Sequence, residues 1–143
     1  MPAYSKLGSL IDIVSQASME IGIAQKPAST VVSSLDQDII QMRSLLSAVA
    51  SELLMDEPYK SILGDGYWIE DANGVRKDTW SADSDIILFD RRLAIEGVKY
   101  RFLKAKGLES GEELRDFSSR LNRISAEING RVLDLDVEEG RSQ

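Results

Sequence analysis

Residues 85–106 constrain the fold most strongly, because this segment has apolar side chains on two sides of a predicted helix. A helix that is apolar over much of its circumference must be covered on more than one side. The segment is therefore predicted to be a central helix or to contact two surfaces. One row contains Ile86, Phe89, Leu93, Gly97, Tyr100 and Leu103, and the other contains Leu88, Ile95, Val98 and Phe102.

Two earlier segments show one apolar stripe each at steps of three and four residues, which predicts amphipathic helices. The first helix ends before Gly22, where a left-handed cap is expected. The second begins at Ser34, which stands in capping-box spacing with Gln37, and ends before Pro58. The stripes are Leu7, Leu10, Ile11, Val14, Ala17 and Ile21, then Leu35, Ile39, Met42, Leu46, Val49 and Leu53.

A fourth helix is predicted from Ser110, which stands in capping-box spacing with Glu113, to about residue 129. Its apolar side chains alternate steps of three and four and form a short seam like that of a coiled coil. The seam consists of Leu114, Phe117, Leu121, Ile124 and Ile128.

Between the second and third helices the period changes, and residues 67–80 predict a β-hairpin. Asn73 and Gly74 suit the positive backbone angles of a tight turn. A lone hairpin is marginal in water, so its aromatic side chains must rest on the helices or on another chain. We expect this insertion to span about residues 64–82.

After Gly130, apolar and acidic residues alternate, which is typical of a strand. The alternative is a frayed chain end, and we favour a docking strand formed by Val132, Leu133, Leu135 and Val137. The predicted fold is mainly α: a four-helix bundle-like domain (residues 1–130) with an inserted β-hairpin and an extended C-terminal tail (residues 131–143).

The composition argues against catalysis. The chain of 143 residues has no Cys and no His, so it lacks thiolates, the commonest general base and the commonest ligand of transition metals. We expect no catalytic, cofactor-binding or metal-binding residues. An enzyme that works through carboxylates or Tyr is the hypothesis that we rank lowest. Asp83, Asp85 and Asp90 are interpreted as capping and solvated residues in preference to a metal site.

A net charge of −7 argues against tight binding of nucleic acid, although DNA can pass a negative wall without sticking to it. No apolar run approaches the roughly 20 residues that cross a bilayer, so we expect no membrane partner. The first residues lack the layout of a signal peptide, which predicts synthesis in the cytoplasm.

Six residues are candidates for contacts with other subunits. Trp68, Trp80 and Tyr67 are either hot-spot residues of an interface or ordinary packing residues. Arg91, Arg92 and Arg101 either pair with acidic groups of their own chain or meet an acidic patch on a neighbour.

Three stretches of the chain resemble the head-to-tail connector proteins (adaptor or neck proteins) of tailed bacteriophages, particularly of the short-tailed kind. The first is the opening helix, residues 10–23, with the loop that contains Pro27. The second is the long helix that ends at residues 51–54 (SELL). The third comprises residues 85–90 (DIILFD), Ala94, residues 100–107 (YRFLKAKG) and residues 113–117.

This resemblance implies a structural virion protein that forms a ring, commonly of twelve copies, between the portal and the tail. The C-terminal segment would insert into the portal protein, the hairpin would reach a neighbour or a tail or neck protein, and DNA would pass through the lumen. It also implies that the third helix turns one side to its own core and the other to a neighbour, with the protein located at the neck of the virion. The alternative is a cytosolic helical interaction module, a regulator or chaperone, that binds a partner helix along the seam of the fourth helix.

Overall fold

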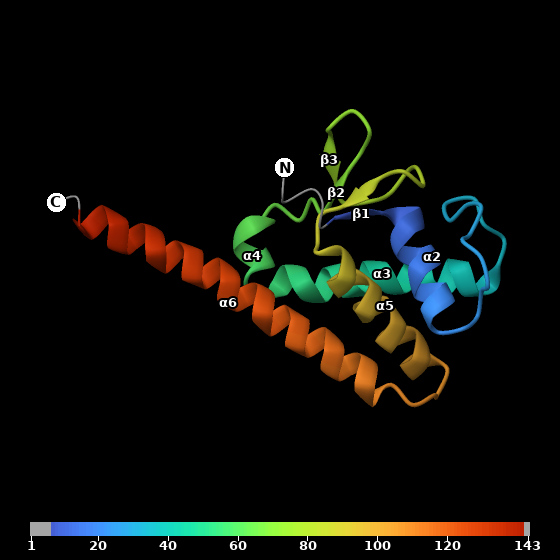
Figure 1. The fold of residues 1–143 in the computed structure, drawn as a ribbon. Helices are drawn as coiled ribbons and strands as arrows, with labels where there is room; N and C mark the ends of the chain where they lie inside the picture. Colours follow the sequence, from blue (N-terminus) through green and yellow to red (C-terminus); the bar gives the residue numbers. More distant parts are fainter. Residues whose placement is uncertain (1–6, 142–143) are drawn as a thin grey trace.

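The computed structural model describes the backbone of residues 7–141 and the side chains of residues 7–128. Within this part of the chain, five helices and a small four-stranded antiparallel sheet make the protein mainly α with some β (Figure 1). The helices are α2 (Leu10–Glu20), α3 (Gln37–Met55), α4 (Tyr59–Ile62), α5 (Arg91–Ala105) and α6 (Gly111–Arg141). The strands are β1 (Gly8–Ser9), β2 (Ile69–Glu70), β3 (Arg76–Lys77) and β4 (Ile86–Ile87).

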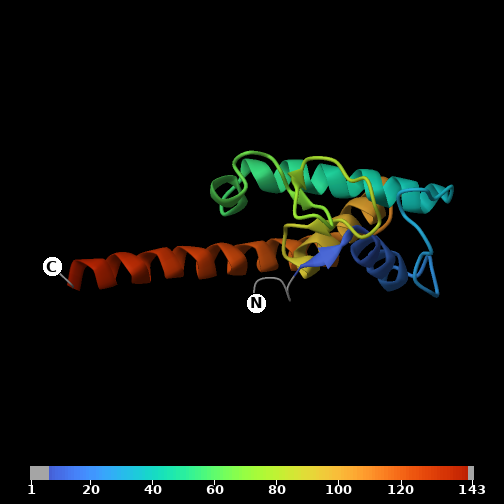
Figure 2. The same ribbon diagram turned by 90° about the horizontal axis from the view of Figure 1, so that it is seen from above.

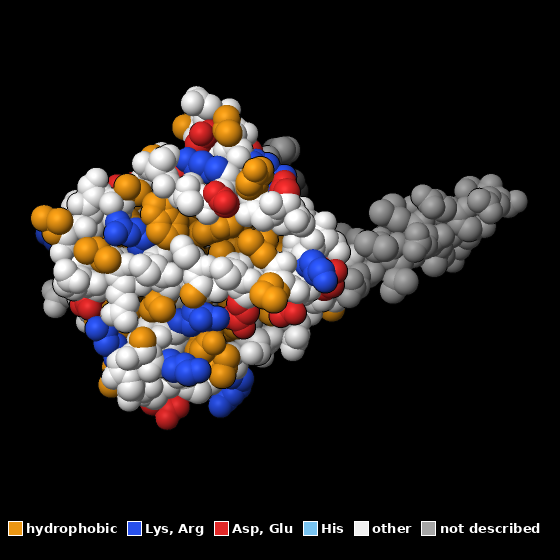
Figure 3. Space-filling view, turned by 180° about the vertical axis from the view of Figure 1, so that it is seen from behind, with side chains coloured by type: hydrophobic (Ala, Val, Ile, Leu, Met, Phe, Trp, Pro, Cys, Tyr) orange, Lys and Arg blue, Asp and Glu red, His pale blue; other side chains and the backbone are white. Residues whose placement is uncertain are grey.

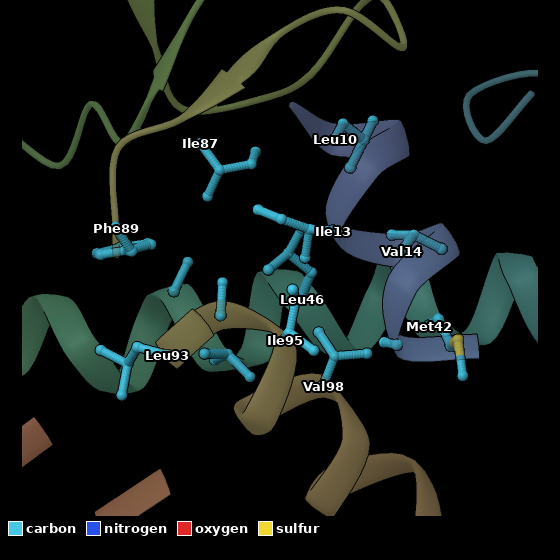
Figure 4. Close-up of a cluster of buried hydrophobic side chains, with 14 of the residues drawn as sticks. Leu10, Ile13, Val14, Met42, Leu46, Ile87, Phe89, Leu93, Ile95 and Val98 are labelled. Carbon is cyan, nitrogen blue, oxygen red and sulfur yellow. The ribbon is translucent and has the colours of Figure 1, made fainter. Parts of the chain in front are cut away.

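Helix α5 lies at the centre and packs against α2, α3 and α6 of the same chain (Figure 1). Its predicted start is wrong, because Asp90 caps the helix by accepting the N–H of Leu93 at 2.9 Å. We also expected this helix to turn one apolar side to a neighbouring subunit. That expectation is corrected, because three helices of the chain itself cover α5. Figure 4 shows side chains from α2, α3, β4 and α5 converging in one core.

Gly97 is the point of closest approach between α5 and its neighbours. A Cβ atom built at this position would lie 2.9 Å from Val49 Cγ1 on α3 and 3.0 Å from Phe117 Cε2 on α6. Only a residue without a side chain fits between these two groups. The glycine therefore sets how tightly α3, α5 and α6 pack.

The predicted hairpin is present, and it belongs to a larger sheet. Strands β2 and β3 pair around a turn in which Gly74 has a positive φ of 78° and donates to the Asp71 carbonyl at 3.0 Å. Strand β4 pairs with β2 on one side and with β1 on the other, which gives the order β1-β4-β2-β3. Residues 8–9 thus lie beside residues 86–87.

The N-terminal cap of α3 differs from the predicted one, whereas no such cap was predicted for α2. Ser9 accepts the N–H of Asp12 at 3.2 Å at the start of α2. Asp36, and not Ser34, caps α3 by accepting the N–H of Asp38 at 2.9 Å. The predicted left-handed glycine after the first helix is confirmed, since Gly22 has a φ of 83°.

Helix α6 runs without a break to Arg141 and leaves the body of the protein (Figures 1 and 2). The prediction of an extended strand after residue 130 is therefore wrong for the backbone of residues 131–141, which is helical. With a rise of 1.5 Å per residue, 31 helical residues span about 46 Å. None of the helices in the described part of the chain is long and apolar enough to cross a membrane.

Candidate protein-interaction surfaces

The two tryptophans of the hairpin region pack against each other and against the core. The Trp68 ring is nearly parallel to Phe89 at a centroid distance of 5.8 Å, and Trp80 meets Trp68 edge-on at 6.1 Å. Trp68 is only 5% exposed, so its prediction as a contact residue is corrected. Tyr67 is 46% exposed and Trp80 is half-buried, and these two side chains reach the surface.

Arg91 and Arg101 bind acidic groups of their own chain. Arg91 Nε and Nη2 donate to the two carboxylate oxygens of Asp12 at 2.6 and 3.0 Å, and these bonds raise the pKa of Arg91. Arg101 donates to Glu52 and lies over the ring of Tyr100, with 5.6 Å between Cζ and the ring centroid. Both side chains therefore join α5 to neighbouring helices.

Arg92 forms the strongest of these pairs. Its Nη1 and Nη2 donate to Glu20 Oε2 and Oε1 at 2.5 and 2.6 Å, and Lys99 Nζ donates to Glu20 Oε1 at 2.9 Å. The hydrogen bonds from Arg92 lower the pKa of Glu20 to about 2 against the opposing effect of burial, with a further contribution from Lys99. The arrangement is a bidentate pair that joins α2 to α5.

Glu96 extends this network from α5 to α6. It is 6% exposed and accepts from Arg92 Nε at 3.2 Å, while Arg120 Nε lies 3.5 Å from its other oxygen. Charges of alternating sign thus run from Glu20 through Arg92 and Glu96 to Arg120. The sequence left two interpretations open for Arg91, Arg92 and Arg101: ion pairs within the chain or contacts with a neighbour. In the structure all three form ion pairs within their own chain.

A hollow of about 360 Å³ opens beside the start of α5, and four arginines contribute to its lining. Arg120 Nε is buried without a hydrogen-bond partner, and Arg123 forms no ion pair with the described side chains. The hollow combines four cationic, two acidic and one aliphatic side chain. Its lining residues are Asp90, Arg91, Arg92, Arg120, Arg123, Ile124 and Glu127.

The three aspartates near the start of α5 hold the backbone. Asp83 accepts the N–H groups of Val31 and Val32, and Asp85 accepts those of Ser81 and Ala82. Burial alone would raise the pKa of both carboxyls. The hydrogen bonds outweigh this effect, so the pKa of each carboxyl lies below its ordinary value. Among the described residues, no group of three acidic side chains is arranged to hold a metal ion.

The seam of α6 is covered in part, and Phe117 is its buried member. Phe117 is 3% exposed and its ring centroid lies 5.8 Å from that of Tyr100, while Leu121 and Ile124 pack at the edge of the core. Only Leu114 is an exposed member of the seam. The side chains of Val132, Leu133, Leu135 and Val137, the predicted docking residues, lie outside the described ones.

The large apolar side chains that remain exposed come from loops and helix ends. In Figure 3, hydrophobic side chains lie across the middle of the face opposite to that of Figure 1. Leu35 was predicted on the apolar stripe of α3, but it precedes the helix and is 90% exposed. Met55 lies off the predicted apolar stripe of α3, which agrees with its exposure of 76%. The exposed set is Ile23, Leu35, Met55, Ile62, Tyr67, Val75, Leu108 and Leu114.

These surfaces consist of ion pairs used within the chain, open hollows and scattered exposed side chains. Apolar residues that are scattered singly over a surface are normal in folded proteins and do not by themselves mark a contact site. Comparisons of the chain with protein-family models, with curated proteins and with solved structures find no match.

Proposed function

We propose that the protein is a structural connector of a tailed bacteriophage, which forms a ring between the portal protein and the tail. The projecting part of α6 carries this proposal. The C-terminal part of the helix lies beyond the body of the protein (Figures 1 and 2), and a helix of this kind gains stability when a partner covers it. The four-helix bundle-like body would then form the wall of the ring.

The portal protein is the proposed partner of the projecting helix. Val132, Leu133, Leu135 and Val137 provide four aliphatic residues within six positions at the far end of α6. They would dock as part of a helix, and this revises the strand that the sequence predicts. Burying an aliphatic side chain in a partner stabilises a complex by about 1.5–3 kcal/mol.

The exposed hairpin side chains are the proposed contacts with a neighbour or with tail and neck proteins. Tyr67 and Trp80 provide aromatic surface, and exposed Val75 lies at the turn between β2 and β3. The net charge of −7 fits a ring through which DNA passes, since a negative wall repels the duplex. The ring, of twelve copies by the resemblance, would thus assemble at the neck of the virion.

Deletion of residues 131–143 tests the proposal. The shortened chain should keep the body folded, since the core lies within residues 10–117, and should lose binding to the portal protein encoded in the same genome. Binding is measured with purified proteins by calorimetry, and rings are sought by electron microscopy. The matched control is Val75→Ser, which changes an exposed apolar residue of the hairpin and should leave portal binding intact.

Two outcomes contradict the proposal. Unchanged portal binding after the deletion would remove the projecting helix from the contact. A complex with one partner and without a closed ring would favour the alternative, an interaction module. That alternative would use the seam from Leu114 to Ile128, in which Phe117 is buried against α5 and Leu114 is exposed.

A further inference from the structure

Acidic residues are concentrated in the first part of the chain. Residues 7–85 contain five Lys or Arg and thirteen Asp or Glu, whereas residues 86–141 contain eleven of each. The part with α2, α3 and the sheet is therefore strongly acidic, and the part with α5 and α6 is neutral overall. A cationic site on α5 and α6 would attract the acidic part of another copy.

The arginine-lined hollow is a cationic site on α5 and α6. Arg91 and Arg92 already bind Asp12 and Glu20, and Arg120 pairs with Glu96 at 3.5 Å, so Arg123 provides the remaining capacity. Arg123 has no ion-pair partner among the described side chains. A carboxylate that entered the hollow would pair with Arg123, with Ile124 beside it as an apolar contact.

The start of α3 has the complementary chemistry. Leu35 precedes the cap of α3, a position from which an apolar residue ordinarily packs onto the first turns of the helix. It is instead 90% exposed. The carboxylates of Asp36 and Asp38 lie within three residues of it, and the only cation near Asp38 among the described residues is Lys106, at 3.9 Å. This segment therefore presents one aliphatic and two acidic side chains.

We propose that the arginine-lined hollow of one copy binds the start of α3, at Leu35, Asp36 and Asp38, of the next copy. The loop before α3 lies at the end of the molecule away from the projecting α6 (Figures 1 and 2). A contact between the two sites joins different faces of successive copies, and such head-to-tail contacts close into rings. The inference rests on the proposed ring, because it names the contact between its copies.

A second segment could compete for the hollow, because it also combines an exposed apolar residue with acidic ones. It consists of Met55, Asp56 and Glu57. It adjoins α4, which lies at the end from which α6 projects (Figures 1 and 2). A contact between that segment and the hollow would also join different faces of two copies. Met55 is, however, less exposed than Leu35, at 76% against 90%, and Glu57 already accepts the hydroxyl of Ser61 at 2.6 Å. The start of α3 is therefore the better occupant.

Cysteine cross-linking tests the contact in the full chain, which has no cysteine of its own. Gln37→Cys places a thiol at the exposed start of α3, and Glu127→Cys places one at the rim of the hollow without removing an arginine. The two single variants, mixed with and without the portal protein and mildly oxidised, should form a cross-linked dimer. The double variant should form a ladder of higher oligomers.

Controls separate this contact from others. Met55→Cys mixed with Glu127→Cys should not cross-link, and a dimer from that pair would overturn the choice of α3. Arg123→Glu added to the double variant should abolish the ladder, whereas Arg115→Glu, the same charge change at an exposed position of α6, should preserve it. A ladder that survives Arg123→Glu would overturn the role of the hollow.

The result also separates the two proposals. Absence of cross-linking both with and without the portal protein overturns the inference, even if portal binding is normal. Cross-linking in a protein that does not bind the portal overturns the connector assignment and leaves the contact between copies in place.

Discussion

Asp83 and Arg43 bind the backbone of the same two residues, Val31 and Val32. Asp83 Oδ1 accepts the N–H groups of Val31 and Val32 at 2.8 Å each, and Arg43 Nη1 donates to the carbonyls of the same residues at 2.9 and 2.7 Å. The two side chains come from the segment before β4 and from α3. Together they fix the long loop that joins α2 to α3.

Asp83→Ala should destabilise the protein by about 1–3 kcal/mol, because it leaves backbone donors at the buried Val31 without an acceptor. Chemical denaturation followed by circular dichroism measures the change. Asp78→Ala is the matched control, since Asp78 is exposed, and it should change stability by less than about 0.5 kcal/mol. Equal effects of the two variants would show that the hydrogen bonds of Asp83 do not hold the loop.

Glu20 should make stability depend on pH in the acid range. Its pKa is lowered from 4.5 to about 2 in the folded protein, so its contribution is complete above pH 4.5 and is lost as the pH falls toward 2. Glu20→Gln should therefore flatten the dependence of the unfolding free energy on pH in this window. It should also lower stability at pH 7 by about 1 kcal/mol, since the pair is partly exposed.

The measurement for Glu20 is a series of denaturation curves between pH 2 and pH 7. Glu112→Gln provides the control, because Glu112 is exposed and forms no ion pair among the described residues. An unchanged pH profile for Glu20→Gln would mean that the bond between Arg92 and Glu20 does not form in solution.

Gly97→Ala should destabilise the protein although alanine favours helices. The added Cβ would meet Val49 and Phe117, and overpacking costs about 1–3 kcal/mol, against about 1 kcal/mol regained from helix propensity. Val49→Ala removes the nearest methyl groups. In a double-mutant cycle measured by thermal unfolding, the combined variant should lose less stability than the sum of the two single changes, and strict additivity would contradict the close contact.

Trp68→Ala and Tyr67→Ala should differ sharply although the residues are adjacent. Trp68 packs on Phe89 in the core, so its truncation should cost about 3–5 kcal/mol. Tyr67 is exposed, and its truncation should cost less than about 0.5 kcal/mol. Denaturation curves compare the two variants, and a stable Trp68→Ala protein would place this ring outside the core.

The sequence predicted the main helices because their apolar residues recur at helical spacing, which is a local property. It assigned residues 86–87 to a helix because Ile86 and Phe89 also fit that spacing. Their strand structure depends on pairing with residues 8–9 and 69–70, which are distant in sequence. The cap at Asp90 could not be distinguished from the one expected at Asp83, since both are aspartates before an apolar run.

The candidate contact residues were predicted less well than the fold. Trp68 and Trp80 have the same residue type, and only the packing on Phe89 shows which one is buried. The arginines of α5 find acidic partners on α2 and α3, and such pairs depend on how the helices cross. The sequence could indicate an excess of charge on α5 but could not reveal that Asp12, Glu20 and Glu52 neutralise it.

The position of β1 beside β4 has a consequence for synthesis on the ribosome. Residues 8–9 are made first, yet their partners at residues 86–87 follow almost eighty residues later, as does most of the surface on which α2 packs. At about 5–20 residues per second, the nascent chain waits about 4–16 seconds before its first helix can be enclosed. During that interval Leu10, Ile13 and Val14 are open to chaperones, so folding of this protein is completed late in translation.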